Sequence, residues 1–166
     1  MKAIDDLQAA FAGESQANRK YLAFAKKADA DGFPQVAKLF RAAAAAETVH
    51  AHAHFQVLGG VKSTAENVAA AIAGETYEVQ TMYPNFIADA QAEKNAGATR
   101  SFTLALAVEK IHANLYQQAL TSIKAGKDLA PVKYYICDVC GNTVEGAAPD
   151  KCSICGAVKS KFSEVA

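Results

Sequence analysis

The sequence predicts an all-α protein in which an antiparallel four-helix bundle is followed by a small metal-binding domain. Three observations support this prediction. Residues 1–126 are rich in Ala, Glu, Lys, Leu and Gln, which favour helices. Apolar residues recur there at steps of three and four, as on one face of a helix. All four cysteines lie between residues 137 and 155, where the composition changes.

Turn and capping signals divide the first 126 residues into four helices of about 25 to 30 residues. Proline in the first turn of a helix costs no hydrogen bond, and a Ser-x-x-Glu sequence is a capping box. The helix boundaries are at residues 31–34, Gly59-Gly60, 63–66, 95–97 and Gly126. Short connections favour antiparallel neighbours, with one longer crossing link expected around residues 59–64.

Charge and hydropathy narrow the class of protein. The formal net charge is zero, so no overall field attracts nucleic acid or an anionic membrane. No apolar run is long enough to span a bilayer, and the first residues, MKAIDDLQ, lack the apolar core of a signal peptide. Cysteines confined to one segment favour a metal site over a disulfide framework. We therefore expect a soluble, cytoplasmic protein.

The inward faces of the four predicted helices are apolar at their ends and polar in the middle. Each middle turn carries carboxylates, and two of them carry a Glu-x-x-His pair. The candidate metal-binding residues of these faces are Glu14, Glu47, His50, Glu75, Glu78, Glu109 and His112. All four helices therefore direct carboxylates toward the same layer of the bundle.

A metal explains why so many carboxylates would face one layer. Two carboxylates about 5 Å apart repel by roughly 3 kcal/mol at an effective dielectric constant near 20, so cations must neutralise the group. Carboxylates with two imidazoles suit iron or manganese, and Glu from two helices with Glu-x-x-His from the other two is the di-iron pattern. Alone, a Glu-x-x-His pair usually indicates only surface ion pairs. Two copies, each matched by an upstream glutamate, favour the metal.

Four further side chains near these motifs have simpler interpretations. Helix geometry turns His52 away from His50, toward solvent, while His54 follows one turn on as a packed residue or one near the ligands. Tyr21 and Tyr83 are core aromatics that could donate a hydrogen bond to a metal ligand.

Two Cys-x-x-Cys-Gly units predict a tetrahedral metal site, with ligands Cys137, Cys140, Cys152 and Cys155. The glycine lets the backbone curl so that N–H groups point at sulfur. Zinc would make this module a structural ribbon, whereas iron would make it a one-electron carrier. The expected organisation is a bundle over residues 1–126, a linker over 127–133 and the cysteine domain over 134–166.

The chain resembles the rubrerythrin family over nearly its full length. The resemblance rests on AFAGESQAN around Glu14, on GETYEVQTMYP, on both Glu-x-x-His pairs and on the terminal knuckles. It implies a ferritin-like bundle with a rubredoxin-like tail. It also implies a di-iron peroxidase that reduces hydrogen peroxide to water in oxidative-stress defence, linked to NAD(P)H through an electron-donor redox protein.

The resemblance also implies the cofactors, the ligands and the assembly. Two non-haem iron ions would bind Glu14, Glu47, His50, Glu75, Glu78, Glu109 and His112, with Tyr21 and Tyr83 beside them. One iron would bind the four cysteines. A head-to-tail homodimer is implied, and some family members exchange helices between subunits. Ser153 and Asn142 depart from the usual rubredoxin-like knuckle, but neither is a ligand position.

The sequence suggests a catalytic hypothesis and leaves alternatives open. Glu78 and His50 are the expected catalytic pair, since exchanging one for the other as the iron is reduced would keep the site near neutral. A ferroxidase or an iron-storage protein would share the bundle. A zinc ribbon would share the knuckles but would be colourless.

Overall fold

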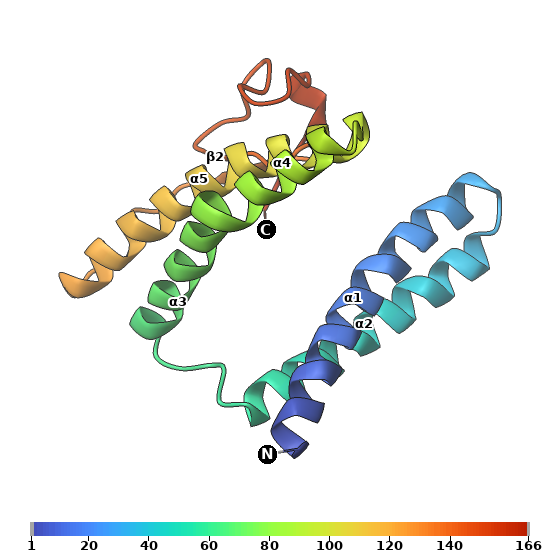
Figure 1. The fold of residues 1–166 in the computed structure, drawn as a ribbon, viewed down its shortest axis with the longest axis horizontal. Coiled ribbons are helices and arrows are strands. Elements are labelled where there is room, and N and C mark those ends of the chain that lie inside the picture. The colour runs from blue at the N-terminus through green and yellow to red at the C-terminus, as the bar shows by residue number, and fades with distance from the viewer. Residues whose placement is uncertain (1, 166) are drawn as a thin grey trace. The chain divides into compact units, whose positions relative to one another are not determined.

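The computed structural model describes residues 2–165, and the chain divides into two compact units, residues 1–62 and 63–166. The N-terminal unit is an antiparallel hairpin of α1 (Lys2–Ala30) and α2 (Pro34–Val57), side by side along their lengths (Figure 1). As the sequence predicts, the second helix starts with proline, where a missing N–H costs nothing.

Small side chains form the contact between α1 and α2. The buried residues of the two helices are Ala25, Ala28, Ala37, Ala44 and Ala51. Alanine has no atoms beyond Cβ, so the two helices can approach closely. Phe11 and Phe55 stack at the open end of the hairpin, with ring centroids 4.9 Å apart. Alanines thus line the α1–α2 contact from the turn toward the open end, where two aromatic rings stack.

The link from α2 to the next helix is short. It runs from Leu58 to Ser63, and Gly59 adopts a left-handed backbone with φ of 67°. From Val57 to Thr64 such a segment reaches about 24 Å at most. It does not cross back along α2, whose 24 residues extend about 36 Å. The long crossing link expected from the sequence is therefore absent.

The C-terminal unit begins with a long helical path that is widened in its middle. It consists of α3 (Thr64–Tyr77), the π-helical turn η1 (Glu78–Met82) and α4 (Tyr83–Ala92). The predicted capping box is confirmed, because Ser63 and Glu66 cap each other. Pro84 follows the π turn, and proline disrupts the α-helical hydrogen bonds of the preceding turn. The sequence predicts one continuous third helix here, whereas the structure inserts a π turn between α3 and α4.

The last helix, α5 (Ala96–Lys124), returns antiparallel along α3 and α4. Asn95 caps it by accepting a hydrogen bond from the Ala98 N–H at 3.0 Å. No helix among residues 2–165 combines the length and the apolar character needed to cross a bilayer.

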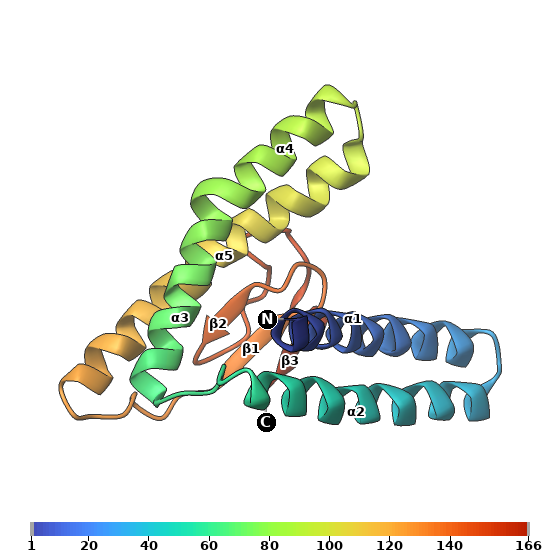
Figure 2. The same cartoon turned by 60° about the horizontal axis from the view of Figure 1, so that its bottom comes forward.

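A small antiparallel sheet completes the C-terminal unit. Its strands are β1 (Tyr134–Cys137), β2 (Thr143–Glu145) and β3 (Phe162–Glu164), with β1 in the centre, and the turn η2 (Lys159–Lys161) precedes β3. The β2 strand lies against α5, and Figure 2 shows the strands beside this helix. The predicted fold class, a helical ferritin-like domain followed by a small strand domain with a four-cysteine knuckle, is confirmed.

Candidate metal centres

The N-terminal hairpin brings together Glu14, Glu47 and His50. One ligand atom of each lies within 4.8 Å of the others. Glu14 lies on α1, while Glu47 and His50 lie three residues apart on one face of α2. The Nδ1 atom of His50 is 3.0 Å from Oε2 of Glu47. Two carboxylates and one imidazole nitrogen converge here, as a metal ion requires.

Hydrogen bonding couples the two carboxylates of this group. A shared hydrogen bond with Glu47 raises the pKa of Glu14, and the same bond lowers the pKa of Glu47. Asn18 fixes the hairpin beside them, because its amide donates to the Ala44 carbonyl at 2.7 Å and to the Thr48 hydroxyl at 2.8 Å. A cation between the carboxylates would replace the shared proton.

The C-terminal unit holds a matching group of Glu75 on α3 and Glu109 and His112 on α5, again with ligand atoms within 4.8 Å. The Nδ1 atom of His112 is 2.7 Å from Glu109 Oε2 and 4.0 Å from Glu75 Oε2. Glu75 Oε2 is buried and has no hydrogen-bond partner among residues 2–165. Burial raises the pKa of Glu75 to about 7, and the Glu109 carboxylate contributes to the rise. An orphaned buried oxygen facing a carboxylate and an imidazole fits a metal ligand.

Glu78 and Tyr83 lie close to this second group without joining it. Glu78 opens the π turn, and burial, followed by the charge of Glu109, raises its pKa. Burial raises the pKa of Tyr83, and the nearby charge of Glu78 contributes to the rise. Tyr83 therefore keeps its proton at neutral pH and can donate a hydrogen bond. Of the two predicted carboxylates of the third helix, Glu75 is the one in the compact group.

Three other residues singled out in the sequence lie on the α1–α2 hairpin. Tyr21 packs against Phe40, with ring centroids 6.1 Å apart. His52 is exposed, while His54 is partly buried and close enough to lower the pKa of Glu14. In the second group, a residue that no sequence motif indicates also takes part, because the Thr143 hydroxyl lies 2.8 Å from His112 Nε2. The two residues are 31 positions apart, and no local pattern connects them.

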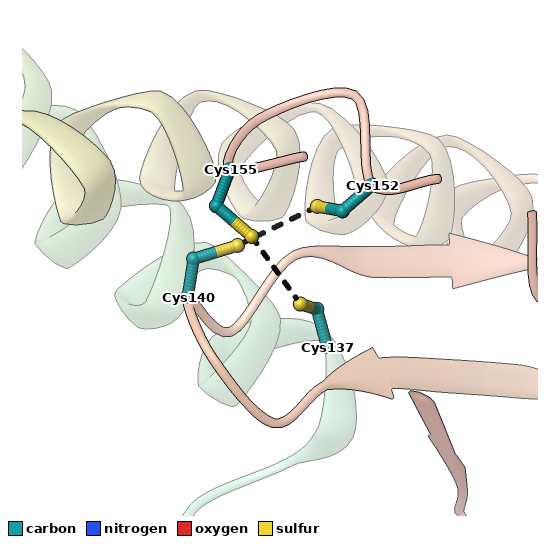
Figure 3. Close-up of side chains that lie close together, drawn as sticks. All are labelled: Cys137, Cys140, Cys152 and Cys155. Carbon is teal, nitrogen blue, oxygen red and sulfur yellow. Dashed lines mark hydrogen bonds between the residues drawn. The ribbon is translucent and has the colours of Figure 1, made fainter. Parts of the chain in front are cut away.

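The four cysteines converge from two knuckles (Figure 3). Cys137 Sγ is 3.7 Å from Cys155 Sγ, and Cys140 Sγ is 3.6 Å from Cys152 Sγ. A tetrahedral ion with metal–sulfur bonds of about 2.3 Å places its sulfur atoms about 3.8 Å apart. The four sulfur atoms are therefore already near the spacing that one ion requires.

Backbone geometry supports the knuckles. Gly141 and Gly156 follow the two Cys-x-x-Cys units with φ of 82° and 77°, a conformation that favours glycine. Burial opposes ionisation of Cys152, but N–H groups of Cys155 and Ile154 donate to its sulfur, and the net effect lowers its pKa to about 6. Burial raises the pKa of Cys140 to about 12. A bound cation would hold all four as thiolates.

Comparisons with known proteins agree with this arrangement. Residues 5–120 match the rubrerythrin family model, and residues 135–163 match the model of the rubrerythrin rubredoxin-like domain. Rubrerythrin-2 of Clostridium acetobutylicum is 38% identical over 95% of this chain and 94% of its own. Nigerythrin of Nitratidesulfovibrio vulgaris is 36% identical over 96% of this chain and 85% of its own. A structure of fully reduced, all-ferrous nigerythrin covers 98% of this chain and 86% of that chain, with a TM-score of 0.59 and 35% identity.

The donor groups and the comparisons together identify the cofactors. Carboxylate and imidazole ligands with an orphaned oxygen suit a rubrerythrin-type di-iron site, and the converging cysteines suit a rubredoxin-like site. The predicted cofactors are therefore confirmed as those of a rubrerythrin-type di-iron site and a rubredoxin-like four-cysteine site.

Proposed function

Because the chain belongs to the rubrerythrin family of di-iron oxidative-stress proteins, we propose that this oxidoreductase is a peroxidase that reduces hydrogen peroxide to water. Its electrons would come from NAD(P)H through a redox protein and enter at the four-cysteine site. The observation that carries the proposal is the pair of Glu–Glu–His groups combined with the four-cysteine site. The protein would act in the cytoplasm, with a bundle over residues 1–126, a linker over 127–133 and a cysteine domain over 134–166.

The proposed ligands are the seven residues that the sequence analysis selected. The di-iron ligands would be Glu14, Glu47, His50, Glu75, Glu78, Glu109 and His112. Two ferrous ions would supply the two electrons that one peroxide molecule consumes. Each Glu–Glu–His group offers three ligands, which is fewer than a non-haem iron site needs when water is excluded. The two groups would therefore combine into one di-iron site.

His50 and Glu78 would be the ligands that change with redox state. The His50 side chain is 57% exposed, and Glu78 lies outside the compact group. A neutral imidazole and a carboxylate differ by one charge, so exchanging them compensates for a change in iron charge. Tyr83 would donate a hydrogen bond to a carboxylate ligand, and Tyr21 would do the same on the opposite side.

The assembly that best fits the short link is a homodimer with exchanged helices. Ferritin-like bundles contain one long crossover connection, and the link from Leu58 to Ser63 is too short to provide it. Apolar residues on the inward face of α2 remain open, with Val36 45% and Val57 69% exposed. We propose that each bundle pairs the α1–α2 hairpin of one chain with the α3–α5 hairpin of a second copy.

Peroxide turnover tests the proposed function. The iron-loaded, full-length protein should oxidise NAD(P)H through a donor redox protein when peroxide is added, with a higher kcat/KM for peroxide than for oxygen. His50→Ala and Glu78→Ala should each lower peroxide turnover by at least about 10-fold. His52→Ala, on the exposed side of the same helix, is the matched control.

The competing function is that of a ferroxidase. Iron oxidation by oxygen that leaves a stored ferric product, together with no peroxide turnover, would favour it and refute the peroxidase. Full peroxide turnover in both variants would instead refute the roles of His50 and Glu78.

A further inference from the structure

His112 offers its two ring nitrogens to different parts of the C-terminal unit. Its Nδ1 atom faces the carboxylates, 2.7 Å from Glu109 Oε2. Its Nε2 atom faces the cysteine domain, 2.8 Å from Thr143 Oγ1. Thr143 is the first residue of β2, in a strand position that pairs with Ile136 of β1, so its hydroxyl is held by the sheet.

The Thr143 hydroxyl can accept a hydrogen bond from His112 because its own hydrogen has another partner. The Thr143 hydroxyl donates to the Gly141 carbonyl, with oxygens 3.3 Å apart. When a metal ion takes the lone pair of Nδ1, Nε2 carries the ring hydrogen and donates it to the Thr143 hydroxyl, whose own hydrogen can point to the Gly141 carbonyl. Nδ1 is the nitrogen that faces Glu75 and Glu109.

The surroundings favour this hydrogen bond. A cavity of about 370 Å³ borders both residues, and its lining includes Val68, Leu115 and Ile136. Apolar neighbours lower the local dielectric constant, which strengthens a hydrogen bond. The His112 side chain is 29% exposed, compared with 57% for His50. Among the described residues, the structure provides no hydrogen-bond partner for Nε2 of His50, so the two histidines differ.

We propose that Thr143 is a positioning residue that fixes His112 in the Nε2–H tautomer, so that Nδ1 is the metal-binding atom. This inference rests on the proposed di-iron function. Thr143 also connects the two metal sites, because Gly141, whose carbonyl accepts its hydrogen, follows Cys140 in the chain. A hydroxyl from the cysteine domain therefore completes the surroundings of a di-iron ligand, and an electron leaving the tetrathiolate iron has a short path through Thr143 to His112.

Three variants of the full-length protein test this proposal. Thr143→Val keeps the shape but removes the hydroxyl, and Thr143→Ser restores the hydroxyl. Thr103→Val is the matched control, since Thr103 lies on α5 and its hydroxyl donates to the Thr99 carbonyl of the same helix. Ring-nitrogen NMR shifts of His112 in the zinc-loaded protein report the tautomer. Anaerobic titration with iron(II) against a chelator reports affinity, and rapid mixing reports the rate of electron transfer from the tetrathiolate iron.

We expect Thr143→Val to weaken iron(II) binding at the di-iron site by about 10- to 100-fold, the usual cost of losing a partner of a metal-bound histidine. It should also slow internal electron transfer and shift the His112 ring-nitrogen signals. Thr143→Ser and Thr103→Val should behave as the wild type. The proposal is wrong if Thr143→Val keeps wild-type affinity and ring-nitrogen shifts, or if Thr143→Ser is as impaired as Thr143→Val.

Two controls separate this proposal from other failures. The visible absorption of the tetrathiolate iron shows whether the cysteine domain of each variant is folded, and Thr143→Ala replaces Thr143→Val if the latter is not. Peroxide turnover is measured separately. A protein that binds iron in a Thr143-dependent way but does not reduce peroxide would refute the peroxidase and leave the positioning role intact.

Discussion

The short link between the two hairpins predicts that complementary variants restore each other. Glu47→Ala/His50→Ala removes two candidate ligands from the N-terminal Glu–Glu–His group, and Glu109→Ala/His112→Ala removes two from the C-terminal group. In a helix-exchanged dimer each di-iron site takes one group from each chain. Neither variant alone can then form a complete site. A mixed dimer contains one site with both groups intact and one site with neither.

The geometry sets the expected size of the recovery. The link reaches about 24 Å, whereas a crossing along α2 needs about 36 Å, so exchange should be complete. Random pairing of equal amounts makes half of the dimers mixed, and half of the sites in those dimers are intact. About a quarter of the wild-type number of di-iron sites should therefore return.

The assay counts iron directly. The two variants are unfolded together, refolded with iron(II) and washed with a chelator, and total iron is compared with the tetrathiolate absorption, which counts chains. Each variant refolded alone, and the two mixed without unfolding, are the controls. If the co-refolded mixture holds no more di-iron sites than either variant alone, each bundle forms within one chain and the reasoning from link length is wrong.

Three further changes test individual residues. In the metal-free protein, the stability associated with the proton on Glu75 should be fully present below its usual pKa of 4.5 and be lost as the pH rises through about 7. Urea denaturation should show this loss, and Glu75→Gln should remove it. Ser63→Ala should lower the free energy of unfolding by about 1 kcal/mol, measured the same way, since it removes a helix cap. Cys152→Ser should abolish the tetrathiolate absorption and donor-driven turnover, while helical circular dichroism persists. Ser153→Ala, the control, should keep the absorption, the turnover and the circular dichroism. Unimpaired donor-driven activity in Cys152→Ser would rule out the electron relay.

The features that the sequence predicted well depend on local chemistry. Ser63 caps a helix through a residue three positions away, and each cysteine knuckle depends on a glycine immediately after it. The pairing of Glu47 with His50 follows from the spacing of helix faces. Such features need only a few neighbouring residues.

The features that the sequence did not reveal depend on longer-range structure. The π turn over Glu78–Met82 depends on how the whole helix adjusts to Pro84, which follows the turn. The contact of Thr143 with His112 requires the strand domain to lie against α5. Choosing between Glu75 and Glu78 requires the position of α5, which helical periodicity does not provide.

The alanine contact between α1 and α2 controls the distance between the carboxylates of the N-terminal group. Ala44 is 1% exposed and lies one helical turn from Glu47, so the thickness of its side chain sets how far Glu47 stands from Glu14. A single added methyl group there would push the two backbones apart. Natural variants of this protein should therefore accept glycine at this contact far more readily than valine, even where no candidate iron ligand is changed.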